Sequence, residues 1–196
     1  IMTDLNIGSK INLVTGIRFE NNKTTYTSYH GMQTTLPHFN SMGSDTVSSY
    51  TRNNSYSLPS IFLKYDLTDW LAFRYAGTKT LTRPDYADII PLYNISGGSG
   101  SVTYRNPFLK PGVSRNRDYV MTFYENRLGL LSFSYFTKNI RDLIYSSGRR
   151  FITDPSLYGL PNYTEKYQII DYKSNNPYEV LLNGFEIDYQ TRFWYL

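Results

Sequence analysis

The sequence contains no cysteine, which excludes a disulfide framework and any metal site built on thiolates. It is also poor in charge, because charged residues make up 18% of the chain, against about 25% in ordinary soluble domains. The net charge of +4 is modest and the basic residues are scattered, so a nucleic-acid-binding protein is not expected. No stretch approaches the roughly 18 apolar residues of a membrane-spanning helix, and no segment has the pattern of a secretory signal peptide.

Common catalytic motifs are missing as well: the sequence has no H-E-x-x-H, no G-x-S-x-G and no Walker A motif. The only histidines, His30 and His38, lie in one polar segment with no carboxylate close in sequence except Asp45. Exposed loop histidines are therefore a better interpretation than a metal pair. Asp85 and Asp88 supply too few oxygens for a calcium site, which needs about six to eight. We expect no enzyme, no metal site and no cofactor.

What the sequence has in abundance is tyrosine, with 20 residues, and an alternation of apolar and polar residues. In residues 184–193, for example, Phe185, Ile187 and Tyr189 fall on one face, and Glu186 and Asp188 fall on the other. This period of two predicts β-strands with two different faces. Six segments have it: residues 10–20, 58–67, 71–75, 119–123, 131–135 and 184–193. No convincing helix is predicted.

The predicted connections alternate between short and long. Residues 68–69 and 126–129 are expected as tight turns, and residues 4–9 as another short turn before the first strand. The long polar connections are residues 28–55, 83–113 and 146–180. Loops beyond about 12–15 residues are uncommon in compact soluble domains. Short turns at one end and long loops at the other are typical of an outer-membrane barrel, whose short turns are periplasmic and whose long loops are extracellular.

The number of strands predicts how much of a barrel this chain forms. Six strands leave two unpaired edges, and each unpaired backbone group costs several kcal/mol in hydrocarbon. Closed barrels of this kind begin at about eight strands. We therefore predict an all-β, antiparallel transmembrane β-barrel, of which this chain covers about six strands.

Four stretches, in order along the chain, resemble the barrel of the TonB-dependent outer-membrane receptors. They are LPSIFLKYDLTDWLAFRYAGTKTLTRPDYADIIP, NPFLKP, SYFTKNIRDLIY and NGFEIDYQ. In that family they correspond to a hairpin closed by a T-x-x-R-P element, a loop with G-N-P-x-L-K-P, a second hairpin, and a strand written V-x-G-x-E-x-D. The chain departs from the family at Arg105, where glycine is usual, and at Asn183, where an aromatic residue is common.

The resemblance implies a plugged barrel of about 22 strands in the bacterial outer membrane, with residues 1–196 as part of the barrel domain. It implies that the plug domain and the closing C-terminal strands are absent from this chain. The implied function is import of a scarce large solute of the siderophore, glycan, peptide or cobalamin class. The implied partners are the TonB system, through the plug, together with membrane lipid and lipopolysaccharide. A surface lipoprotein is a further candidate partner.

Aromatic residues in the long polar segments are the candidate ligand contacts, because tyrosine offers a stacking face and a hydroxyl at low entropic cost. A girdle at the outer membrane interface is their alternative role. These residues are Tyr29, Phe39, Tyr50, Tyr86, Tyr93, Tyr104, Tyr158 and Tyr163. The basic pair Arg149 and Arg150 could contact lipopolysaccharide phosphates, although an ordinary basic loop explains it equally well.

Polar residues of the predicted strands are the candidate lining of the barrel lumen. They could form a solute path or contact the plug, or they could be polar only because the lumen is wet and charges pair with their neighbours. These residues are Arg18, Lys64, Arg74, Glu186, Asp188 and Arg192.

Two other functions stay open at this stage. One is a soluble or cell-surface all-β carbohydrate-binding module rich in tyrosine, which would need no detergent in solution. The other is a passive porin, which would have no plug.

Overall fold

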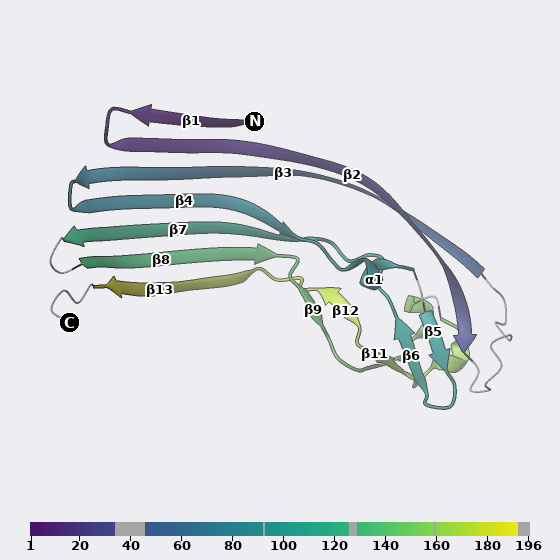
Figure 1. Ribbon diagram of the computed structural model, residues 1–196. Helices are drawn as coiled ribbons and strands as arrows, with labels where there is room; N and C mark the ends of the chain where they lie inside the picture. The colour runs from purple at the N-terminus through teal and green to yellow at the C-terminus, as the bar shows by residue number, and fades with distance from the viewer. Residues whose placement is uncertain (34–45, 92, 126–128, 159, 192–196) are drawn as a thin grey trace.

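The computed structural model describes residues 1–33, 46–91, 93–125, 129–158 and 160–191. Long antiparallel strands dominate it, and they lie side by side in one curved sheet (Figure 1). The prediction of an all-β antiparallel fold is confirmed. The long strands are β1 (Met2–Ile7), β2 (Ile11–Gln33), β3 (Thr46–Thr68), β4 (Leu71–Thr82), β7 (Gly112–Glu125), β8 (Gly129–Arg141) and β13 (Val180–Gln190).

The long strands pair in the order β1-β2-β3-β4-β7-β8-β13, so each hairpin partner is the next long strand in sequence. The turn predicted at residues 68–69 is confirmed to within a residue, since β3 ends at Thr68 and β4 begins at Leu71. The turn predicted at residues 126–129 falls on residues 126–128, which lie outside the described residues. The prediction of a turn at residues 4–9 is wrong, because Met2–Ile7 is a strand paired with residues 11–16. The turn is shorter, at residues 8–10, and Gly8 provides its positive φ of 62°.

The interpretation of residues 28–55 as a long loop is also wrong. Strand β2 continues to Gln33, β3 begins at Thr46, and the two remain paired as far as His30 and Thr46. This extension has threonine and asparagine on both faces, so the apolar alternation that marks a strand in sequence is missing. Threonine and tyrosine nevertheless favour extended backbone.

The other two long connections fold together into a small structure of their own, which we call the loop unit (residues 83–111 and 142–179). Figure 1 shows the loop unit at the end of the long strands that lies opposite the short turns. Its elements are α1 (Tyr86–Ile89), β5 (Tyr93–Ser96), β6 (Ser101–Tyr104), β9 (Ile144–Ser146), β10 (Arg150–Phe151), η1 (Pro155–Tyr158), η2 (Asn162–Thr164), β11 (Gln168–Ile170) and β12 (Lys173–Asn175). No helix among the described residues is long and apolar enough to cross a membrane.

The loop unit is continuous with the main sheet. β5 pairs in parallel with the end of β2, β6 pairs with β5, and β11 pairs in parallel with β6. It also has a hydrophobic core, whose buried members are Ile95, Val102, Ile152, Leu160 and Ile169. Tyrosines pack around this core. The predicted loops are therefore folded elements with fixed positions, not open connections.

Candidate functional site

The register gives the long strands one apolar face and one polar face. On the apolar face, Phe73 pairs with Met121, Met121 with Phe133, and Phe133 with Ile187. Many of these side chains are exposed, including Ile187 at 70%. We call this the apolar face, and exposed apolar side chains over so many neighbouring strands indicate contact with another apolar phase.

A row of aromatic rings crosses the apolar face. Tyr75 of β4, Tyr119 of β7, Tyr135 of β8 and Phe185 of β13 are cross-strand neighbours. Successive ring centroids are 5.1, 6.2 and 4.8 Å apart. We call these four residues the aromatic row. Such rows lie at the membrane–water interfaces of outer-membrane barrels.

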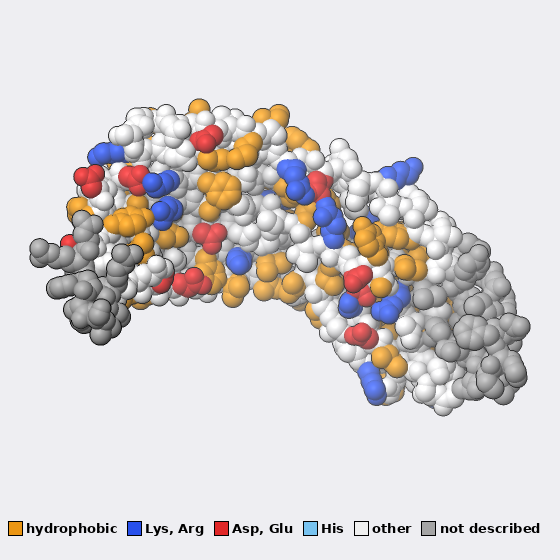
Figure 2. Space-filling model, in the orientation of Figure 1, with side chains coloured by type: hydrophobic (Ala, Val, Ile, Leu, Met, Phe, Trp, Pro, Cys, Tyr) orange, Lys and Arg blue, Asp and Glu red, His pale blue; other side chains and the backbone are white. Residues whose placement is uncertain are grey.

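The polar face carries five of the six residues predicted to line the lumen. Arg18, Lys64, Arg74, Glu186 and Asp188 all lie on it, and Arg192 lies outside the described residues. Figure 2 views this face, with acidic and basic side chains intermingled over the strands.

Several of these charges pair on the polar face itself. The Nζ atom of Lys64 is 2.8 Å from a carboxylate oxygen of Asp66. Arg74 donates hydrogen bonds to the hydroxyls of Tyr124, at 2.9 Å, and Thr122, at 3.4 Å. Asp188 accepts a hydrogen bond from Gln190 at 2.9 Å. Lys64, Arg74 and Asp188 are thus held by neighbouring side chains on the same face.

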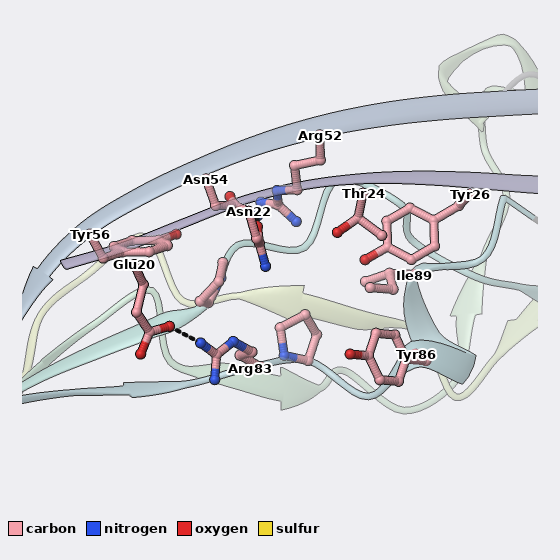
Figure 3. A pocket seen from close by; sticks show the side chains of 12 residues that line it. Glu20, Asn22, Thr24, Tyr26, Arg52, Asn54, Tyr56, Arg83, Tyr86 and Ile89 are labelled. Atoms are coloured by element: carbon pink, nitrogen blue, oxygen red, sulfur yellow. Dashed lines mark hydrogen bonds and ion pairs between the residues drawn. The ribbon is translucent and has the colours of Figure 1, made fainter. Parts of the chain in front are cut away.

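A hollow opens where the loop unit folds over the polar face of β2 and β3 (Figure 3). Its volume is about 110 Å³, well below the roughly 300–1,000 Å³ of small-molecule sites. It can therefore form only part of the contact surface for a large solute. Its lining is Glu20, Asn22, Thr24, Tyr26, Arg52, Asn54, Tyr56, Arg83, Pro84, Tyr86, Ile89 and Pro111.

Ion pairs and hydrogen bonds fix the basic side chains of this hollow. Glu20 of β2 forms ion pairs with both Arg18 and Arg83, which places the end of β4 against β2. Arg52 of β3 donates a hydrogen bond to the carbonyl oxygen of Leu109 in the loop unit. The lining contains two guanidinium groups, Arg52 and Arg83, and one carboxylate, Glu20, so it carries a net positive charge, which favours anionic ligands.

A buried carboxylate joins the two halves of the loop unit. Asp88 is 6% exposed, and its carboxylate lies 2.6 Å from Nζ of Lys173 and 3.3 Å from Nη1 of Arg105. The hydrogen bond from Lys173 to Asp88 raises the pKa of Lys173 above its ordinary value. Asn106, in the N-P-F-L-K-P stretch, donates a hydrogen bond to the carbonyl oxygen of Lys173 at 3.1 Å. Asp85, by contrast, caps α1 through the backbone N–H of Ala87.

Tyr86 is the predicted aromatic residue that lies at the hollow, where it is 72% exposed. Tyr50 packs edge-on against Phe108, with ring centroids 5.1 Å apart. Tyr163 is exposed on the loop unit, and Tyr93 packs against its core. The side chain of Tyr29 and the whole of Phe39 lie outside the description.

Tyr104 and Tyr158 form a three-ring cluster with Tyr172, with centroid separations of 5.5, 5.9 and 6.1 Å. Burial raises the pKa of Tyr104 and of Tyr172. The cluster packs against the core of the loop unit, so its first role is structural.

The sequence missed the basic side chain of Arg52 and the polar row of Glu20, Asn22, Thr24 and Tyr26. The β2 residues could have been found by extending the alternation beyond Arg18, because every second residue of β2 falls on the polar face. Arg52 had no such signal, because the segment around it was interpreted as a loop. Among the described residues, no group of three or more His, Asp or Glu side chains could hold a metal ion.

Comparison with known proteins gives a family and a fold. The family model described as "TonB dependent receptor-like, beta-barrel" matches residues 1–196. No curated protein sequence matches.

Solved structures share the fold at low sequence identity. A double mutant of the Serratia marcescens hemophore receptor HasR, in complex with its hemophore HasA and heme, is 16% identical, with a TM-score of 0.61 over 95% of this chain and 30% of that chain. The Pseudomonas aeruginosa ferric enterobactin receptor PfeA, in a mutant complex with enterobactin, is 16% identical, with a TM-score of 0.51 over 95% and 32% of the two chains. The siderophore receptor PirA of Acinetobacter baumannii is 15% identical, with a TM-score of 0.54 over 95% and 24%.

Proposed function

Because the chain belongs to the family of TonB-dependent receptor β-barrels, we propose that it forms part of the wall and mouth of a plugged transporter that imports a scarce large solute. The resemblance found in the sequence is confirmed, and the location is the outer membrane of Gram-negative bacteria. The chain spans about 30% of the length of the HasR structure. The plug and the remaining strands would therefore come from other residues of the receptor, and the TonB system would act on that plug.

The folded loop unit is the observation that carries this proposal. A loop unit with its own core, a buried ion-pair network and a sheet connection to β2 holds its side chains in fixed places. Such preorganisation lowers the entropic cost of binding a solute. A passive pore gains nothing from ordered loops that cover its polar face, so a plugged receptor fits better than a porin.

The orientation of the chain in the membrane follows from the position of the loop unit at one end of the strands. The short turns at one end of the strands would be periplasmic, and the loop unit at the other end would be extracellular. The polar face would line the lumen, and the apolar face would meet lipid. The apolar face also disfavours a soluble carbohydrate-binding module, because an exposed apolar surface across seven strands would aggregate in water.

For the solute, we favour an anionic iron chelate or heme. The excess of guanidinium groups at the hollow supports an anion, and the related solved structures include receptors for ferric enterobactin and for a heme-carrying hemophore. Arginine binds carboxylate and phenolate oxygens through paired N–H groups. Tyr86 would add a stacking surface at the rim.

Uptake by the full-length receptor tests this function. Cells that lack their own receptors would be given ferric enterobactin or hemin, with and without a functional TonB system, and accumulated iron would be measured. We expect accumulation of one of these probes that requires TonB. In Arg52→Gln/Arg83→Gln we expect uptake at a limiting concentration to fall by about tenfold or more, since charged hydrogen bonds contribute about 1.5–3 kcal/mol each.

Lys10→Gln is the matched control, because it removes a cation at the turn end of the strands, far from the hollow, where Lys10 donates to the carbonyl oxygen of Leu67. It should leave uptake unchanged. Accumulation that is equal with and without TonB would favour the porin instead. Partition of the full-length protein into the aqueous phase without detergent would favour the soluble module.

A further inference from the structure

Three basic residues cluster on the apolar face just beyond the aromatic row. Lys79 of β4 pairs directly with Arg115 of β7, and Arg117 follows two residues along the same face of β7. Both arginines are exposed and Lys79 is half-buried. We call these three residues the outer basic patch.

The patch has an unfavourable arrangement that the protein relieves only in part. Like charges directly opposite one another in a sheet are destabilising. Among the described residues, none of the three cations has an ion pair. Glu179 attracts Arg115 by charge, but its carboxylate accepts a hydrogen bond from Asn139 and forms an ion pair with Arg141. This single carboxylate cannot balance several neighbouring cations, so the patch keeps a net positive charge.

The aromatic row fixes the level of the patch relative to a membrane. Arg117 pairs with Gly77, and Gly77 lies two residues beyond Tyr75 on the loop-unit side. A Cβ atom at Gly77 would lie 2.7 Å from the hydroxyl oxygen of Tyr75. The Tyr75 side chain therefore leans toward the patch, with its polar tip on the side where water and headgroups begin.

We propose that the outer basic patch binds the phosphate groups of lipopolysaccharide in the outer leaflet. This inference rests on the orientation in the proposed function, with the loop unit outside. The lipid acyl chains would lie against the apolar face below the aromatic row, and the phosphorylated glucosamine headgroup would reach the level of Arg115 and Arg117. Guanidinium groups bind phosphate oxygens in paired, charge-assisted hydrogen bonds, and basic clusters beside a membrane attract anionic lipid.

The sequence suggested Arg149 and Arg150 for this role, but the structure favours the new patch. Arg150 lies in β10, which pairs with β11 inside the loop unit, and its guanidinium carbon is 6.0 Å from the ring centroid of Tyr172. Neither residue belongs to a strand that carries the aromatic row. Any lipid contact there would lack the adjoining apolar surface.

Titration of the purified full-length receptor with lipid A, followed by native mass spectrometry in detergent, tests the proposal. We expect Arg115→Gln/Arg117→Gln to bind lipid A about thirtyfold more weakly, since each cation contributes about 1 kcal/mol at a membrane surface. The control variant Lys23→Gln/Arg149→Gln also removes two exposed positive charges, but at positions distant from the aromatic row. It should bind lipid A as tightly as the unchanged receptor does. Arg115→Lys/Arg117→Lys keeps the charge but loses the paired hydrogen bonds, so its binding should lie between that of the unchanged receptor and that of the glutamine variant.

Three further measurements make the result decisive. Dephosphorylated lipid A should bind the unchanged receptor as weakly as lipid A binds the glutamine variant, and inorganic phosphate should not compete at millimolar concentration. Retarded migration of unheated samples in denaturing gels confirms that each variant barrel is folded. Equal binding by the glutamine variant and the unchanged receptor, or equal binding of both lipids, would overturn the proposal. Iron uptake is a separate readout, so its loss alone would count against the proposed function and not against this site.

Discussion

Removal of the Asp88 charge should open the loop unit without affecting the barrel strands. The carboxylate is buried and lies 2.6 Å from Lys173 and 3.3 Å from Arg105. Asp88→Asn keeps the size of the side chain but removes the charge that holds both cations. Since Lys173 lies in the second half of the loop unit and Asp88 in the first, the two halves lose their shared ion pair.

The magnitude follows from the burial of the three partners. Loss of one partner from a fully buried ion pair costs about 3–5 kcal/mol. Here the side chains of Lys173 and Arg105 are 34% and 31% exposed, so water can solvate them when the carboxylate is gone. We therefore expect about 2 kcal/mol, or a roughly thirtyfold increase in the population of the opened loop unit.

Hydrogen exchange of the full-length receptor in detergent measures this opening directly. Peptides that contain β6 and β11 should lose about thirtyfold in protection, while those from β4 and β7 should exchange as before. Asp85→Asn is the matched control, because it removes a charge from the same loop and asparagine caps a helix as well as aspartate does. Unchanged protection in β6 and β11, or an equal loss in β4 and β7, would refute the reasoning.

The same contact predicts a dependence on pH at the alkaline end. The pKa of Lys173 is raised above its ordinary 10.5 by its hydrogen bond to Asp88. A raised folded-state pKa contributes stability that is complete below the unfolded-state pKa and is lost as the pH rises through the folded-state pKa. Protection of the loop unit should therefore hold up to about pH 10 and fall above 10.5. In Asp88→Asn this alkaline loss should be much smaller, because only the charges of Asp171 and Asp85 still act to raise the pKa of Lys173.

Three further changes test the barrel strands and their connection. Ile187→Arg should cost about 2–4 kcal/mol if the residue lies near the bilayer midplane, whereas Asp188→Arg, on the polar face, should be much milder; equal folded fractions in lipid vesicles would contradict the assigned faces. Gly184→Ala should lower the free energy of unfolding, measured by urea titration, by about 1–3 kcal/mol, because its Cβ would lie 2.7 Å from the ring of Phe136. Phe136→Leu in the same chain should relieve part of that cost. Asn139 and Arg141 lower the pKa of Glu179 by hydrogen bonding, so its stabilising contribution is present above pH 4.5 and should be lost as the pH falls below that value, seen as faster exchange at residues 176–180.

The sequence predicted the membrane-facing part of the fold well and the aqueous part poorly, for one physical reason. Alternation is visible only where the two faces of a strand meet different surroundings. Residues 11–19 and 58–67 alternate clearly, because one face is apolar and the other polar. Beyond Phe19 both faces of the hairpin are polar, so the pattern disappears although the strand continues. Met2–Ile7 was missed although Leu5 and Ile7 alternate with Asp4 and Asn6, because residues 4–9 were interpreted as a turn.

The hollow was less predictable than the fold because its side chains come from three distant segments. Arg52 and Glu20 are brought together by the pairing of β2 with β3, and Arg83 by its ion pair with Glu20. Each residue alone had an ordinary local setting in the sequence. Only the register and the folded loop unit place them around one space, and neither can be derived from local patterns.

The β2–β3 hairpin joins the apolar face of the sheet to the loop unit through one pair of strands. Its outward face carries the apolar side chains of Ile11, Leu13, Ile17 and Phe19 and becomes polar beyond Phe19. The rest of β2 rises roughly 40 Å further at about 3.3 Å per residue, and there its end receives β5 of the loop unit in parallel pairing. Backbone hydrogen bonds thus transmit the rigidity of the barrel wall to the loop unit. The charged side chains at the hollow are held by that same framework, which is why a site built mainly from loop residues has a defined geometry.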